Sequence, residues 1–139
     1  MPNLQFDSGV REYTLNGAVT VRFNPTDMVF AERLFQVFDE LDARQERYTA
    51  EVEKTEDNKA LFSLARAMDT EMRETINGIF GADVCTPLFG SMSVYAASGG
   101  LPVWCNLLLA LIDEMDESFT AEKAKTNPRI QKYIKKYKR

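Results

Sequence analysis

The sequence predicts a mainly α domain of the α+β class, in which an N-terminal β-hairpin precedes a helical hairpin, an apolar C-terminal helix and a short basic terminal helix. Apolar residues alternate on both sides of an early Asn-Gly turn signal, two long segments then carry apolar residues at helical spacing, and the most apolar run, residues 101–112, comes late. A chain of 139 residues with 45% hydrophobic content suits one core. We expect residues 1–127 to form a single α+β domain and residues 128–139 a basic amphipathic tail.

The first element is a β-hairpin around Asn16-Gly17, a strong turn signal. The apolar residues that alternate with polar ones on its two sides are Tyr13, Leu15, Val19, Val21 and Phe23. A two-residue loop would put the two apolar sets on opposite faces of the hairpin. A three-residue loop made of residues 15–17 avoids this conflict, pairs Tyr13 with Val19, and gives Gly17 the left-handed conformation that such loops need.

Two amphipathic helices are predicted next. Asn24 can cap the first, Pro25 suits its first position, and Asp27 adds negative charge near the positive end of the helix dipole. Its apolar stripe can run to Val52, after which an acidic stretch interrupts it. The second helix, ended by Gly81, carries one apolar face made of Leu61, Ala65, Met68, Met72, Ile76 and Ile79. We expect the two helices to pair as an antiparallel hairpin, and a single long bent helix is the alternative.

The rest of the domain is a punctuated segment followed by the main core helix. Residues 78–100 hold five glycines and a proline, which leave room only for short helical turns such as residues 82–89. An apolar helix then runs from Val103 to about Thr120, and its inner face is formed by Trp104, Leu107, Leu108, Leu111, Ile112 and Met115. Pro128 disfavours helical geometry at Asn127 and separates this domain from the tail.

Charge is strongly divided along the chain. All 21 acidic residues lie at or before Glu122, where 9 basic residues leave a formal charge of −12, while the 8 basic residues of positions 123–139 give +8. The tail places apolar residues at helical spacing between basic ones, which predicts a cationic amphipathic helix. The candidate protein-binding residues are Ile130, Tyr133, Ile134, Tyr137, Lys132, Lys135 and Lys136. The tail can lie across its own acidic body, or across that of a neighbour in a homo-oligomer such as a ring or a spiral.

Several kinds of chemistry are disfavoured. The chain has no histidine, which excludes Ser-His-Asp and Cys-His catalysis and imidazole metal ligation. Cys85 and Cys105 lack the spacing of a metal or redox motif and are predicted to be buried and reduced. Carboxylates at residues 39–42 and 113–117 read as solvated helix faces, and no glycine-rich phosphate loop is present. We therefore predict no catalytic, cofactor-binding or metal site, and no enzyme activity.

Residues 101–112 are much shorter than the ~20 residues of a membrane span, and residues 1–5 lack the pattern of a secretory signal. These features predict a cytoplasmic protein without membrane contact. Nucleic-acid binding would depend on the tail alone, since the body is acidic, and it is not expected.

Short motifs in the second half of the chain are similar to a known family. They are Ile-Asn-Gly-Ile-Phe-Gly at residues 76–81, Leu-Phe-Gly at residues 88–90, and an apolar helix from Pro102 that ends in Leu-Ile-Asp-Glu-Met at residues 111–115. They resemble the C-terminal half of the tail assembly chaperones of long-tailed phages and prophages. The short β N-terminus, Phe-Asn-Pro at residues 23–25 before a long helix, and the Lys/Tyr-rich end also suit that family, so the resemblance covers most of the chain. The long first helix and residues 85–100 depart from it.

The resemblance implies a non-enzymatic chaperone in the bacterial host cytoplasm. Such a protein is expected to bind the tape-measure protein and keep it soluble until the tail tube protein assembles around it. Two alternatives remain open. The first is a small regulatory nucleic-acid-binding protein that uses the basic C-terminal tail, and the second is a structural tail completion protein that stays in the virion.

Overall fold

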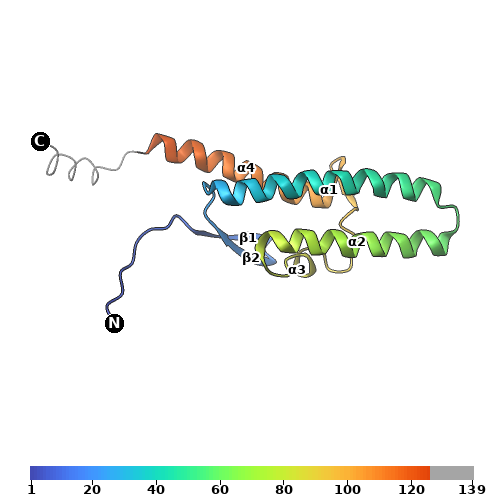
Figure 1. Ribbon diagram of the computed structural model, residues 1–139, viewed down its shortest axis with the longest axis horizontal. Coiled ribbons are helices and arrows are strands. Elements are labelled where there is room, and N and C mark those ends of the chain that lie inside the picture. The colour runs from blue at the N-terminus through green and yellow to red at the C-terminus, as the bar shows by residue number, and fades with distance from the viewer. Residues whose placement is uncertain (126–139) are drawn as a thin grey trace, which may run out of the picture.

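The structure, a computed structural model, describes residues 1–125 as a mainly helical α+β domain. In chain order its elements are β1 (Arg11–Leu15), β2 (Val19–Phe23), α1 (Met28–Lys54), α2 (Asn58–Phe80), α3 (Cys85–Phe89), β3 (Ala97–Ser98), β4 (Leu101–Pro102) and α4 (Val103–Ala124). Helices α1 and α2 lie side by side as an antiparallel hairpin, and α4 packs along α1 (Figure 1). Within residues 1–125 the predicted mainly α, α+β fold class and the predicted helical hairpin are both confirmed, which rules out a single bent helix. The predicted short basic terminal helix lies outside the described residues.

Strands β1 and β2 pair antiparallel, but in a register that differs from the prediction. Tyr13 lies opposite Val21, whereas the sequence predicted Val19 as its partner. The two registers differ by two residues, so both place the same alternate side chains on the inner face of the hairpin. The apolar pattern therefore predicted the correct face but was unable to choose the register.

The turn of this hairpin explains the difference. The loop has three residues as predicted, but they are Asn16, Gly17 and Ala18 because Leu15 remains in β1. Both Asn16 and Gly17 have positive φ, at 49° and 66°, and the N–H of Ala18 donates to the carbonyl oxygen of Leu15 at 2.9 Å. The chain thus reverses directly after Leu15, which is what two successive left-handed residues allow.

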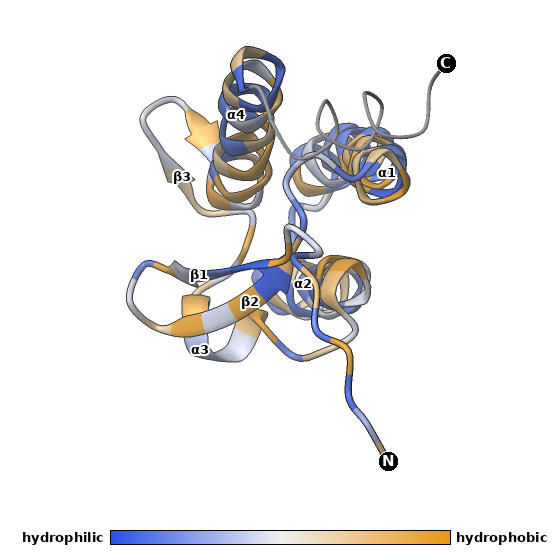
Figure 2. Ribbon diagram, turned by 90° about the vertical axis from the view of Figure 1, so that its left-hand side faces the viewer, coloured by the Kyte–Doolittle hydropathy of each residue, from blue (hydrophilic) through white to orange (hydrophobic). Residues whose placement is uncertain are grey.

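A row of aromatic rings joins the β-hairpin to the helices. Tyr13 stacks on Phe23 with ring centroids 4.8 Å apart, and Phe23 stacks on Phe30 of α1 at 4.5 Å. The ring centroid of Phe30 lies in turn 6.3 Å from that of Phe80 of α2. In the end-on view of Figure 2, α1, α2 and α4 stand at three corners and the hairpin lies beside α2. This row anchors the small sheet to the helical core.

Helix α1 begins at Met28, later than the predicted cap at Asn24 implied. Asp27 is the cap, since its Oδ1 accepts the N–H of Val29 at 2.9 Å. Asn24 instead closes a turn before the helix, because its Oδ1 accepts the N–H of Thr26 at 2.8 Å. Two residues with capping side chains lie three positions apart here, and the position of β2 decides which one the helix uses.

The end of α2 and the start of α4 agree with the prediction, whereas the cap of α2 was not predicted. Asp57 caps α2 by accepting the N–H of Ala60 at 3.0 Å, and Gly81 ends it in the left-handed conformation with φ 67°. Helix α4 begins at Val103 as predicted and continues to Ala124, slightly beyond the predicted end. The side chains completely buried between the helices are Leu34, Leu41, Met72, Ile76 and Leu108.

The small hairpin of β3 and β4 was not predicted. Its turn is Gly99-Gly100, in which both residues have positive φ, at 64° and 84°. A Gly-Gly pair is a recognised hairpin signal, but strands of two residues are too short to show alternation. The sequence therefore predicted only short helical turns in this segment, and the two short strands correct that prediction.

Candidate functional site

The residues predicted to bind protein lie outside residues 1–125, the part of the chain that the structure describes. They are Ile130, Lys132, Tyr133, Ile134, Lys135, Lys136 and Tyr137. The proposed boundary of the tail at residue 128 lies outside this part as well. These predictions therefore stay predictions, and the candidate site within residues 1–125 is a different surface.

That surface is an open groove between the tip of the β1–β2 hairpin, α3 and α4, which we call the α3–α4 groove. Its volume is about 430 Å³, within the range of small-molecule and side-chain pockets. The main apolar side chains that line it are Leu15, Leu88, Phe89, Met92, Val103 and Leu107. Polar groups lie among them, including Asn106 Nδ2, which donates to the Ser98 carbonyl oxygen at 3.1 Å. The groove is suited to apolar side chains of a partner.

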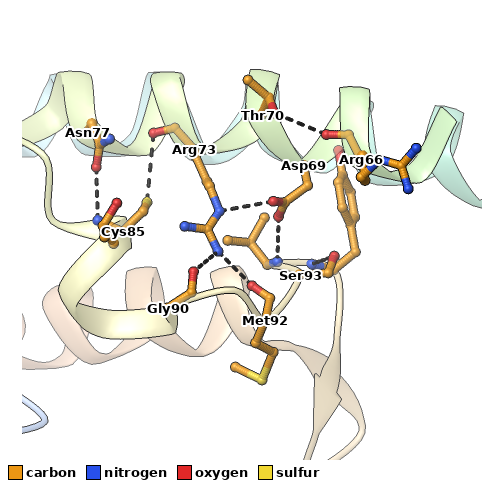
Figure 3. Close-up of polar contacts among 12 residues, drawn as sticks. Arg66, Asp69, Thr70, Arg73, Asn77, Cys85, Gly90, Met92 and Ser93 are labelled. Carbon is orange, nitrogen blue, oxygen red and sulfur yellow. Dashed lines mark hydrogen bonds and ion pairs between the residues drawn. The ribbon is translucent and has the colours of Figure 1, made fainter. Parts of the chain in front are cut away.

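One wall of the α3–α4 groove is held by a polar network on α2 (Figure 3). Nη2 of Arg73 donates to the carbonyl oxygens of Gly90 and Met92, both at 2.7 Å. Nε of Arg73 pairs with Asp69 Oδ2 at 2.9 Å, and the other oxygen of Asp69 accepts the N–H of Val94 at 2.8 Å. The network fastens the loop backbone to α2, while the Met92 side chain points away from α2 (Figure 3) and lines the groove.

The network continues one turn along α2 to the start of α3. Asn77 Oδ1 accepts the N–H groups of Val84 at 2.9 Å and of Cys85 at 3.0 Å. Its Nδ2 donates to Asp83 Oδ1 at 3.1 Å, and Asp83 also accepts the N–H of Thr86. Hydrogen bonding from Thr86 lowers the pKa of Asp83 below its ordinary value. Helix α3 is thereby held at a defined position beside the groove.

Sequence reasoning missed this groove for a physical reason. Apolar side chains that line a binding surface and those that fill a core show the same spacing until their burial is known. Asp69, Arg73 and Asn77 recur every four residues, which places them on one face of α2, but the spacing does not reveal that a loop covers that face. For Leu88 and Phe89, the sequence predicted a short helical turn and a motif shared with the resembled family, but no groove.

The two cysteines are buried and free, as predicted. Burial raises the pKa of Cys85 to about 12, and burial together with the charge of Asp42 raises the pKa of Cys105. A thiol with a raised pKa is protonated at neutral pH and is a poor nucleophile. Burial also raises the pKa of Tyr95 to about 12, where its ring stacks on Tyr48 with centroids 3.9 Å apart.

These shifts predict that the protein loses stability in alkali. In the unfolded state Cys85 ionises near its ordinary pKa of 9.0, whereas in the folded state its pKa is about 12. Between these two pH values the folded state therefore binds more protons than the unfolded state. This contribution is complete below pH 9 and declines as the pH rises, by about 1.4 kcal/mol per unit for each such group. Urea unfolding measured from pH 8 to 11 should show the decline. Cys85→Ala should flatten its first part, and an identical slope in that variant would contradict the assignment.

Within residues 1–125, no group of three Cys, Asp or Glu side chains is arranged to hold a metal ion. In the same part of the chain, no helix combines the length and the apolar character needed to cross a bilayer. Comparisons of the chain with models of protein families, with curated proteins and with solved structures found no match.

Proposed function

We propose that the protein is a non-enzymatic tail assembly chaperone of a long-tailed phage or prophage, and that it binds an apolar helix of the tape-measure protein in the α3–α4 groove. The observation that carries the proposal is this open, largely apolar groove on a strongly acidic domain. The nature of the client follows from the sequence resemblance. The groove supplies a way of holding it.

Such a client needs a partner that covers its exposed apolar surface. A long helical protein exposes its apolar stripes until the tail tube assembles around it. An amphipathic helix can bind a partner by placing its apolar face in a groove. Met92 is 46% exposed at the rim, and its flexible thioether can adapt to different side chains. Residues 1–125 carry 21 acidic and 11 basic residues, and this net negative charge keeps a complex dispersed through mutual repulsion.

The same charge does not favour nucleic-acid binding, which needs a continuous basic surface. The other alternative is a tail completion protein, which differs from a chaperone in that it remains in the virion. Mass spectrometry of purified particles separates the two possibilities. A chaperone should be absent from finished tails, and its presence at the level of a structural subunit would contradict the proposal.

A charge inside the α3–α4 groove should impair client binding. Ala110 lines the groove at an exposed position of α4, so Ala110→Lys leaves the core intact while placing an ammonium group where an apolar side chain would bind. Because that group must be desolvated by the client, we expect affinity to fall about tenfold or more. To measure this effect, the variant and the natural protein are each co-expressed with a tape-measure-like protein encoded downstream of this chain and co-purified with it. Titration with the client then gives the two affinities.

The matched control for this experiment is Ala67→Lys, the same change at an exposed position of α2 that does not line the groove. It should bind the client like the natural protein. If both variants bind the client with equal affinity, the α3–α4 groove is not the site where the client binds. Failure of the natural protein to bind or solubilise the client would instead remove the proposed function itself.

A further inference from the structure

Residues 1–6 form an arm that leaves the domain ahead of β1, and we call it the N-terminal arm. In Figure 1 it runs away from α1 and α4, and the end-on view of Figure 2 shows the same direction. All of its residues are exposed, and the large apolar side chains of Leu4 and Phe6 are 91% and 86% exposed. The described part of the chain therefore leaves both side chains available to a partner.

The base of the arm is fixed by hydrogen bonds. Asn24 Nδ2 donates to the carbonyl oxygen of Ser8 at 2.9 Å. The N–H of Gly9 donates to Asp7 Oδ1, also at 2.9 Å. Gly9 has φ 75°, and a Cβ at this position would lie 2.6 Å from Asn24 Nδ2. Because this close approach requires glycine, the sequence itself sets the direction in which the arm leaves the domain.

The composition of the arm suits an extended ligand with one apolar side. Leu4 and Phe6 are two positions apart, so their side chains lie on the same side of an extended chain. The polar side chains of Asn3 and Gln5 lie on the other side. Residues 1–6 contain no Asp or Glu, although the domain is strongly acidic. The arm can thus approach another copy of the domain without charge repulsion.

An apolar groove that fits this ligand lies between the first part of α1 and the last part of α4, and we call it the α1–α4 groove. It has a volume of about 190 Å³, and its apolar lining includes Met28, Phe35, Ile112 and Phe119. Phe35 is 53% exposed, so part of its ring faces water. Since an apolar cavity of about 150 Å³ holds a benzene ring, the groove can accept the ring of Phe6.

The arm points away from the groove of its own chain, because it runs away from both helices that form this groove (Figures 1 and 2). A second copy removes the difficulty. Each copy offers one arm and one groove, so a twofold arrangement closes with two identical contacts. If Leu4 and Phe6 bury roughly 300 Å² and cover an equal area of the groove, the two contacts bury about 1,200 Å², the lower end for specific interfaces.

We propose that two copies of this chain exchange their N-terminal arms, so that Phe6 of each copy occupies the α1–α4 groove of the other. Leu4 covers the surface beside the groove. The small area makes this a weak and reversible dimer. The α1–α4 groove is a different surface from the α3–α4 groove, so this inference does not depend on the proposed chaperone function.

Sedimentation velocity of the full-length chain tests the exchange. It is measured in about 0.5 M NaCl, where contacts between surface charges are largely screened. The natural chain should dimerise reversibly between about 1 and 200 μM. Phe6→Glu should raise the dissociation constant about a hundredfold, tenfold for each of the two contacts, because the groove would have to desolvate a carboxylate. Residue 6 lies on the exposed arm, so this variant keeps the folded domain.

Phe35→Glu should weaken the dimer to the same extent from the groove side of the contact. Phe62→Glu is the matched control, since Phe62 is 59% exposed on α2 and does not line the groove. It should dimerise like the natural chain. Far-UV circular dichroism checks that all three variants are folded.

A mixture of the arm variant and the groove variant separates arm exchange from other modes of association. Phe6→Glu keeps an intact groove and Phe35→Glu keeps an intact arm. A mixed dimer therefore regains one of the two contacts, and its dissociation constant should be about tenfold lower than that of either variant alone. A natural chain that stays monomeric in this range, or variants that do not recover on mixing, would overturn the proposal. A dimer that persists in Phe6→Glu would also overturn it, because something other than the arm would then join the two copies.

Discussion

Replacement of Trp104 by alanine should lower the free energy of unfolding by about 4 kcal/mol, the largest effect we expect from a single substitution. Trp104 is 2% exposed at the start of α4, and its ring lies edge-on against Phe38 with centroids 5.8 Å apart. Its Nε1–H donates to Gln45 Oε1 at 2.8 Å. The substitution removes the largest buried side chain at the contact of α1 with α4 and leaves the Gln45 acceptor without its partner.

Urea unfolding followed by far-UV circular dichroism measures this effect, because Trp104 is the only tryptophan and its fluorescence is lost in the variant. Trp104→Phe is the useful comparison. It keeps an aromatic ring against Phe38 but loses the hydrogen bond to Gln45, so we expect a smaller loss of about 1–2 kcal/mol. Equal losses in the two variants would contradict the view that ring volume dominates at this position.

Replacement of Arg73 by alanine should cost about 2 kcal/mol and release one wall of the α3–α4 groove. Arg73 joins α2 to the loop through two carbonyl oxygens and through Asp69, and the two side chains are only 17% and 19% exposed. Without the guanidinium, Asp69 keeps a partly buried negative charge with only the N–H of Val94 to offset it. The remaining solvent exposure keeps the cost below that of a fully buried ion pair.

Two measurements follow the release of the loop in the Arg73→Ala variant. The free energy of unfolding should fall, and the Val94 amide should exchange with solvent faster than global unfolding alone explains. Arg66→Ala is the matched control, because Arg66 lies on the same helix with an exposed side chain, and its loss should change stability by less than about 0.5 kcal/mol. An unchanged Val94 exchange rate in Arg73→Ala would show that the network does not hold the loop.

Local patterns predicted much of the fold. The periods of 2 and 3.6 in the apolar residues distinguished the hairpin from the helices, and the left-handed glycine at Gly81 marked the end of α2. Prediction failed where two local solutions were nearly equivalent. The β1–β2 register and the choice of Asp27 over Asn24 as a helix cap both depend on how the hairpin meets the helices.

The candidate site was much less predictable than the fold. The sequence predicted a protein-binding site in the tail, because the tail has an amphipathic and basic pattern. The residues of the α3–α4 groove show no comparable pattern. Its residues come from the hairpin tip, α3, the following loop and α4, segments far apart in the chain. Only packing brings them together. The polar network from Asp69 to Asn77 fastens the loop to α2, and the N–H groups of Val103 and Trp104 at the start of α4 donate to carbonyl oxygens of the same segment.

By itself, the sequence determined the kind and order of the main elements and the separation of charge along the chain, because periodicity and charge are local properties of consecutive residues. The tertiary structure decided which apolar residues remain on the surface. Leu34 and Phe35 are neighbours in α1, yet Leu34 is completely buried and Phe35 is 53% exposed. Burial depends on neighbours contributed by distant segments, so it follows from how the helices pack rather than from the residue itself.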